Sequence, residues 1–132
     1  MTFSLRRRFV LVAFAIAGLA GAAGAATPGV SDSEIRIGQT NPYSGPNSAY
    51  GANGLADAAY FKMINDRGGV NGRKITLLSL DDGYSPPRAV EQTRRLVEQE
   101  EVALIYRSLG TASNMAIAKY LNNRKVDRKS VV

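Results

Sequence analysis

Two loops of this sequence carry the residues best suited to contact a small ligand. The first covers residues 41–48, and the second covers residues 108–113. Each loop follows an apolar segment of strand length and precedes a segment with helical periodicity. In an open parallel α/β sheet, loops in this position lie at the carboxyl ends of the strands, where small ligands bind. We therefore expect both loops to border a binding site.

The second loop has the chemistry of a carboxylate site. It offers two hydroxyl groups and several backbone N–H groups at the expected start of a helix, where the helix dipole adds partial positive charge. Gly110 allows the backbone to approach a ligand closely. The alternative is that Thr111 or Ser113 only caps the helix. The residue types leave both roles open.

Two tyrosines flank the first loop. Tyr50 stands at the expected start of a helix and is the better candidate for the wall of a pocket. Tyr43 is expected to pack against its surroundings. Ser48 is the predicted N-cap of the next helix.

The sequence lacks the groups that catalysis uses most often. It has no cysteine and no histidine, which excludes thiol chemistry and disulfides and removes the commonest general base and metal ligand. Asp81 and Asp82 are adjacent carboxylates, but no nucleophile or further acid accompanies them, so we predict a loop and capping role. The glycines at positions 45, 51 and 54 lack the spacing of dinucleotide and P-loop motifs. We expect no enzyme activity, catalytic residue, metal site or cofactor.

An alternation of strand and helix patterns predicts the fold class. Strands are expected at residues 35–40, 74–81 and 102–106, and helices at residues 49–66, 86–100 and 113–123. This order predicts an α/β fold with a Rossmann-like parallel sheet and flanking helices. The residues expected to face the sheet from the first helix are Ala52, Leu55, Ala56, Ala59 and Met63. Residues 125–126 are candidates for the start of a fourth strand.

Residues 1–26 have the pattern of a cleavable signal peptide. Three arginines at 6–8 precede an apolar stretch, and small residues occupy positions 23–25. No cysteine comes after the apolar stretch, so a lipid anchor is excluded, and we predict export without stable membrane insertion after cleavage. Residues 27–126 contain twelve basic and ten acidic residues. Because this part has no concentrated basic face, nucleic-acid binding is not expected.

Several motifs occur in the order and at the spacing of one known family. They are the segments 35–40 (IRIGQT), 43–46 (YSGP), 49–51 (AYG), 64–75 (INDRGGVNGRKI) and 81–82 (DD). Together they resemble the beginning of branched-chain amino-acid (Leu/Ile/Val) binding proteins, which are type I periplasmic binding proteins of ABC transporters. The resemblance covers essentially all of the chain after the signal peptide.

The resemblance implies a fold of two Rossmann-like lobes that close on a ligand in the cleft between them. It implies that residues 27–126 are an incomplete N-terminal lobe. The ligand-binding residues that it implies are Tyr50, Leu109, Gly110, Thr111, Ala112 and Ser113, with Thr111 at the ligand carboxylate and Tyr50 lining the pocket. The expected function is capture of a branched-chain or related amino acid in the periplasm and its delivery to a membrane ABC permease.

Two other interpretations stay open, and one segment departs from the family. The alternatives are the ligand-binding domain of a sensory receptor with the same fold and a fragment of an α/β enzyme. Family members are much longer than this chain, so a second lobe is expected to be missing. Residues 127–132 differ from the proline and apolar strand expected at this point in the family, and we predict that they are a frameshift or truncation artefact.

Overall fold

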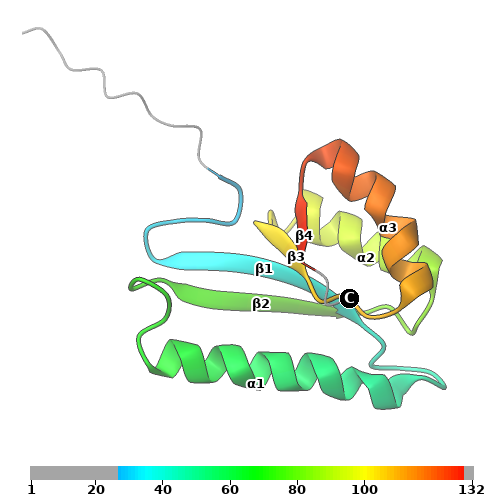
Figure 1. Cartoon of the computed structure of the whole chain (residues 1–132), viewed down its shortest axis with the longest axis horizontal. Helices are drawn as coiled ribbons and strands as arrows, with labels where there is room; N and C mark the ends of the chain where they lie inside the picture. Colours follow the sequence, from blue (N-terminus) through cyan, green and yellow to red (C-terminus); the bar gives the residue numbers. More distant parts are fainter. Residues whose placement is uncertain (1–26, 130–132) are drawn as a thin grey trace, which may run out of the picture.

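The computed structural model of the protein describes residues 27–129 and shows an α/β fold (Figure 1). The elements in chain order are β1 (Glu34–Asn41), the short 3-10 helix η1 (Ser48–Gly51), α1 (Ala52–Asp66), β2 (Lys74–Asp81), α2 (Pro86–Glu98), β3 (Leu104–Tyr106), α3 (Thr111–Arg124) and β4 (Asp127–Lys129). The predicted fold class is therefore confirmed. The signal peptide predicted for residues 1–26 lies outside the described residues.

The four strands form one parallel sheet in the order β2-β1-β3-β4. The chain passes from β1 to β2 on one side and then returns to place β3 on the other side of β1. This reversal makes the carboxyl end of β1 a topological switch point, where α/β sheets bind ligands. Because the strands are parallel, the loops after β1, β2 and β3 all leave the sheet at this same end.

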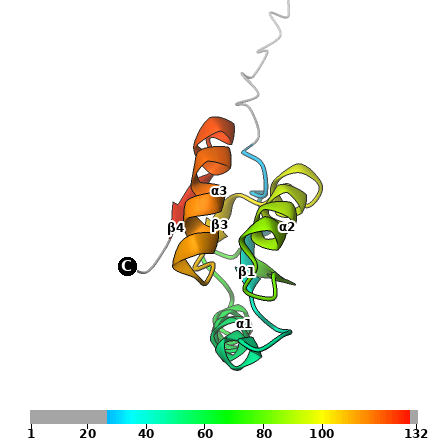
Figure 2. The same cartoon turned by 90° about the vertical axis from the view of Figure 1, so that its right-hand side faces the viewer.

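The helices cover the two faces of the sheet unequally. Helices α2 and α3 lie together on one face, and α1 lies alone on the other (Figures 1 and 2). The main core lies between the α2–α3 pair and the sheet, where Leu96, Ile105, Ile117 and Leu121 are almost completely buried. Burial of four such side chains stabilises the fold by about 1.5–3 kcal/mol each.

The predicted inner face of α1 is wrong. Of the five residues expected to face the sheet, Leu55 is 66% exposed and Met63 is 37% exposed, and Ala52, Ala56 and Ala59 are exposed as well. Gly54, Asp57 and Phe61 face the sheet instead. Apolar periodicity predicted the wrong face because two of the three residues that face the sheet are a glycine and an aspartate, which do not count as apolar.

Each of the three inner residues has a specific neighbour. Gly54 lies against Asn41 and Tyr43, and Phe61 packs edge-on against Tyr106 with 5.4 Å between ring centroids. Asp57 pairs with Arg107. The helix is therefore placed by a close approach, one aromatic contact and one ion pair rather than by an aliphatic stripe.

The ends of two helices also differ from expectation. Ser48 begins η1 and is not the N-cap of α1, because α1 begins at Ala52 after Gly51, with no side-chain capping bond. The fourth strand begins at Asp127 rather than at residues 125–126, because Lys125 ends α3 in a left-handed conformation (φ 56°). Three residues of the unusual tail thus form the parallel partner of β3. Within residues 27–129, no helix is both long enough and apolar enough to span a membrane.

Replacing Gly54 with alanine tests the close approach of α1 to the sheet. A methyl group there would overlap the Tyr43 hydroxyl and lie 3.0 Å from Nδ2 of Asn41. We expect Gly54→Ala to lower the free energy of unfolding by roughly 1–2 kcal/mol because of this overpacking. At a helical position without such a neighbour, a glycine-to-alanine change would raise the free energy of unfolding by about 1 kcal/mol. Thermal denaturation followed by circular dichroism measures the difference.

The matched control is Ala59→Gly on the exposed face of α1. We expect it to lower the free energy of unfolding by about 1 kcal/mol, the difference in helix propensity between alanine and glycine. A Gly54→Ala protein more stable than the parent would contradict the tight packing of α1 against Tyr43.

Candidate functional site

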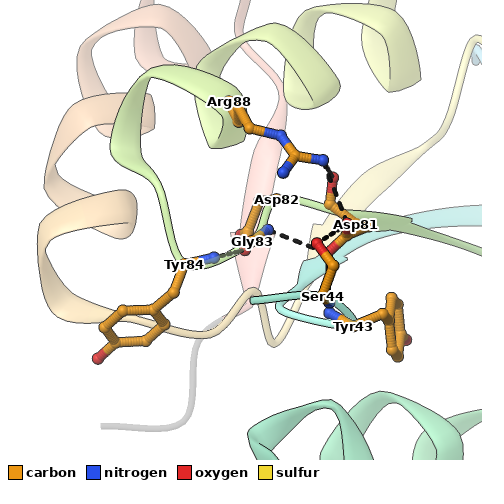
Figure 3. A network of polar contacts seen from close by, with 7 residues as sticks. All are labelled: Tyr43, Ser44, Asp81, Asp82, Gly83, Tyr84 and Arg88. Atoms are coloured by element: carbon orange, nitrogen blue, oxygen red, sulfur yellow. Dashed lines mark hydrogen bonds and ion pairs between the residues drawn. The ribbon is translucent and has the colours of Figure 1, made fainter. Parts of the chain in front are cut away.

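Asp81, the last residue of β2, fixes the loop after β1. Its carboxylate accepts hydrogen bonds from the backbone N–H groups of Tyr43 (2.8 Å), Ser44 (3.1 Å) and Gly83 (3.0 Å). The Ser44 hydroxyl donates to the other oxygen at 2.5 Å, and Nη2 of Arg88 lies 3.1 Å from it (Figure 3). The loop role predicted for the Asp-Asp pair is confirmed for Asp81.

These bonds hold the pKa of Asp81 well below its usual range. The Ser44 hydroxyl is the largest cause, and the backbone N–H groups of Gly83, Tyr43 and Ser44 act in the same direction against desolvation. Since all of these donors favour the charged form, Asp81 is an anion that ties two loops together. Both of its carboxylate oxygens already accept hydrogen bonds, so Asp81 is not free for acid–base chemistry.

Asp82 has the opposite electrostatic environment. Burial raises the pKa of this carboxyl group, while the backbone N–H of Tyr84 donates to Oδ1 at 2.8 Å and lowers it. The bond holds Tyr84 in a left-handed conformation (φ 62°). Asp82 therefore sets the direction in which the Tyr84 side chain leaves the loop.

Tyr84 stacks on Tyr50 at this edge of the sheet. The two ring centroids are 6.2 Å apart with an interplanar angle of 26°. Tyr50 is 54% exposed and Tyr84 is 40% exposed, so both rings present surface to solvent. Tyr43 packs as predicted, with its hydroxyl 2.5 Å from the Ser79 hydroxyl. Sequence reasoning missed Tyr84, although its place directly after β2 was the available signal.

The amino end of α3 is open. Gly110 precedes the helix with φ 104°, and no side chain caps this end. The capping role considered for Thr111 or Ser113 is therefore wrong. Asn114 N–H donates to Gly110 O at 2.9 Å, and the backbone N–H groups of the three preceding residues have no partner within residues 27–129. Such donors at a helix amino terminus favour an anion.

The positive φ of Gly110 favours glycine, and its neighbours lie close. A Cβ atom there would lie 3.2 Å from Cε2 of Tyr84 and 3.4 Å from Oγ of Ser113. The stacked tyrosines thus stand directly beside the start of α3. Thr111 and Ala112 are exposed, while Ser113 is buried with 2% of its surface accessible.

A cavity of about 540 Å³ opens beside the start of α3. Three of the predicted site residues line it: Leu109, Gly110 and Thr111. Tyr50, Ala112 and Ser113 do not. The lining residues that sequence reasoning missed are Asn53, Arg107, Ser108, Asn114, Met115, Ala118 and Arg128. Arg107 directly follows β3, so its position was a signal, whereas nothing in the pattern indicated Arg128.

A buried polar network supports the cavity from beneath. Asp57 pairs with Nη1 of Arg107 at 2.5 Å and accepts a 2.7 Å hydrogen bond from Nε2 of Gln39. Oε1 of Gln39 in turn accepts a bond of 3.1 Å from the Ser79 hydroxyl. The network reaches from β2 through β1 to the loop after β3. Among residues 27–129, no cluster of three or more acids that would suit a metal ion is found.

Comparison with known proteins places this architecture in a family. The model of the periplasmic binding protein family matches residues 34–127. The chain belongs to this family, whose members are binding proteins rather than enzymes.

Individual relatives and solved structures are also periplasmic or ABC transporter substrate-binding proteins, or their homologues. The chain is 35% identical over 113 residues to a Leu/Ile/Val-binding protein homologue of Brucella abortus, covering 83% of this chain and 26% of the relative. It superposes with a TM-score of 0.68 and 26% identity on the branched-chain amino acid transporter substrate-binding protein of Streptococcus pneumoniae, solved in complex with isoleucine, over 74% of this chain and 28% of that one. A fatty acid ABC transporter substrate-binding protein from Thermomonospora curvata gives a TM-score of 0.66 at 30% identity, over 75% and 25%. The chain spans about a quarter of the length of these relatives.

Replacing Asp81 with asparagine tests its role as the anchor of the loops. The folded-state pKa lies below the unfolded value of about 3.8, so the stabilisation is present above that pH and is lost as pH falls through the folded pKa. We expect Asp81→Asn to lower the free energy of unfolding by about 2 kcal/mol at pH 7, since hydrogen bonds to a charged group are lost. The deficit should shrink below pH 4. Denaturant unfolding at pH 7 and pH 3 measures it.

Asp66→Asn is the matched control, because Asp66 makes only an exposed pair with Lys62. Such a pair is worth about 0.3–0.5 kcal/mol. An Asp81→Asn deficit of equal size at both pH values would refute the anchoring role.

Proposed function

We propose that this chain is part of the substrate-binding component of an ABC uptake transporter that captures a branched-chain or related amino acid in the periplasm. Residues 1–26 would direct export, and a membrane permease would receive the solute. Family membership supports the general class. The Leu/Ile/Val-binding homologue of Brucella abortus and the isoleucine complex from Streptococcus pneumoniae support the amino-acid class.

The observation that carries the proposal is the uncapped amino end of α3 beside a cavity. Gly110 has no side chain to cover the backbone there, and Thr111 is exposed. A carboxylate at this point would accept hydrogen bonds from the unused N–H groups and be stabilised by the helix dipole. The stacked pair Tyr50 and Tyr84 lies outside the cavity lining, with Tyr84 next to Gly110.

The described residues supply one side of such a site. They offer donors for a carboxylate, but no acidic side chain lines the cavity to pair with an ammonium group. We therefore propose that the rest of the site comes from further sequence of the kind the longer relatives possess. With only these contacts, the dissociation constant should lie in the millimolar range, which corresponds to about −4 kcal/mol.

Titration of the ¹⁵N-labelled 132-residue chain with L-leucine tests the proposal. We expect chemical-shift changes that concentrate at residues 109–113 and saturate at millimolar ligand. L-Leucinamide, which lacks the carboxylate, should cause much smaller changes there. Equal effects of the two ligands, or the absence of shifts at residues 109–113, would count against the carboxylate contact. Micromolar binding would disprove that this is only one side of the site.

A substitution tests the hydroxyl separately. Thr111→Val keeps the shape of the side chain but removes the hydroxyl, and we expect it to weaken leucine binding about threefold to tenfold, the equivalent of one hydrogen bond. Thr76→Val is the control, because Thr76 lies in β2 and bonds to Glu34 at the far end of the strands. Unchanged binding by Thr111→Val would leave only the backbone groups as ligand contacts.

A further inference from the structure

Strand β2 forms one edge of the sheet (Figure 1). It pairs with β1 along its whole length, from Lys74 opposite Glu34 to Asp81 opposite Asn41, and within the described residues no strand lies on its other side. A free strand edge presents backbone N–H and C=O groups that can pair with another strand. This edge involves neither the amino end of α3 nor the tail that begins at residue 127.

Only alternate residues of β2 present their backbone groups to the free side. Lys74 N–H donates to Ser33 O at 2.9 Å, on the side of β1. Asp82 N–H donates to Asn41 O at 3.0 Å, so the even-numbered residues of the strand bond toward β1. Successive residues of a strand direct their backbone groups to opposite sides. The odd-numbered residues therefore point away from β1, and they are Ile75, Leu77, Ser79 and Asp81.

Two side chains of the same chain already occupy the ends of this free edge. The Asn65 amide donates to Ile75 O at 2.7 Å and accepts from Ile75 N–H at 2.8 Å, as a neighbouring strand would. At the other end, Nη2 of Arg88 donates to Asp81 O at 3.4 Å. A strand that added to the edge at either end would have to displace one of these side chains.

The middle of the edge is open and self-complementary. Among residues 27–129, the backbone N–H and C=O groups of Leu77 and Ser79 have no partner. In an antiparallel arrangement with Leu78 opposite its own counterpart, Leu77 of each copy faces Ser79 of the other. Facing residues of this kind exchange both of their hydrogen bonds, so the free groups of both copies are all paired.

This register is the one that leaves the existing bonds intact. Any other two-fold antiparallel pairing brings Ile75 or Asp81 into a hydrogen-bonded pair, and their carbonyl groups already accept bonds from Asn65 and Arg88. A two-fold pairing also uses the β2 edge of both copies, so it closes at two chains rather than growing into a fibre.

Side chains next to the open window favour the same arrangement. Leu78 packs only partly against the core, and the antiparallel pairing brings it close to its counterpart in the second copy. Exposed Lys74 stands at the amino end of β2, and the anion Asp81 stands at the carboxyl end. Antiparallel pairing brings the basic end of each strand to the acidic end of the other, so opposite charges meet twice.

We propose that the chain binds a second copy of itself through β2, which makes one continuous sheet with a two-fold axis at Leu78. This inference goes beyond the proposed function and uses none of its contacts. A few backbone hydrogen bonds and side-chain contacts make an interface well below the standard size of stable complexes. We therefore expect a weak dimer, with a dissociation constant on the order of 0.1 mM.

Solvent exchange of backbone amides in the ¹⁵N-labelled 132-residue chain tests the register. The samples have protein concentrations about tenfold below and tenfold above the expected dissociation constant. The amides of Leu77 and Ser79 should exchange about fourfold more slowly in the concentrated sample, in proportion to the fraction of monomer. The amide of Leu78 points to β1 and that of Ile75 bonds to Asn65, so these two should not change. Sedimentation equilibrium measures the dissociation constant.

Two outcomes of these measurements would overturn the inference. One is a monomer at every concentration. The other is self-association during which Leu77 and Ser79 exchange at the same rate in both samples, because the copies would then meet through a different surface.

Lys74→Glu tests the antiparallel orientation. It places a negative charge beside the acidic end of the second copy, twice in each dimer, so the dissociation constant should rise about fivefold or more. Lys119→Glu is the matched control, because it changes the net charge equally at an exposed position of α3. The control should stay within about twofold of the parent. Equal dissociation constants for the two variants would refute this orientation.

Leu77→Pro tests the backbone pairing itself. Proline removes an N–H group that points away from β1, so the pairing of β1 with β2 is kept while the dimer loses one donor from each copy. The dissociation constant should rise about tenfold or more. Leu77→Ala is the control, since it shortens the same side chain but keeps the donor. A proline variant that dimerises as well as the alanine variant would contradict the inference. Thermal denaturation verifies folding, and Lys74→Glu decides the question if the proline variant does not fold.

Discussion

The carboxyl end of β1 is the constraint on which the rest of this structure depends. Its last residues are completely buried, so their backbone groups must find partners inside the protein. Thr40 donates to the Ser108 hydroxyl (3.1 Å) and accepts from Leu109 N–H (3.1 Å), and Asn41 O accepts from Asp82 N–H (3.0 Å). The strand end therefore bonds directly to the loops after β2 and β3.

The Gln39 side chain at this strand end also finds its partners inside the protein. Gln39 can bond in two directions, to Asp57 on α1 and to Ser79 on β2. Because Asp57 pairs with Arg107, one buried amide links a helix, two strands and the loop that begins the candidate site. A polar network of this kind is favourable only if its members are paired, which makes the positions of these elements interdependent.

The sequence predicted the order of the strands and helices for a physical reason. Strand and helix periodicities are local, and parallel strands bring their carboxyl ends to one edge, so the loops after β1 and β3 had to meet. Residues 109–111 line a cavity at this end of the sheet, and their role in ligand binding stays a prediction. For the Thr111 and Ser113 hydroxyls the sequence left open a capping role, and only the structure excludes it, because Gly110 precedes α3 and no side chain caps this end.

The features that the sequence did not predict depend on contacts between residues far apart in the chain. The orientation of α1 follows from the pairing of Asp57 with Arg107, fifty positions apart, and no local pattern encodes such a partner. Arg128 joins the cavity only because β4 pairs with β3, and Tyr84 joins the site because Asp82 turns its backbone. Apolar periodicity predicted the wrong face of α1 because it considers only hydrophobic residues, whereas an ion pair places Asp57 on the inner face.

The hydrogen bonds to Asp81 have an entropic consequence. They order the loop after β1 and the loop after β2 before any solute arrives. Ligand association usually loses free energy to the ordering of mobile loops and side chains. For these two loops that ordering has already taken place during folding, so substitutions that rigidify them further would increase ligand affinity little.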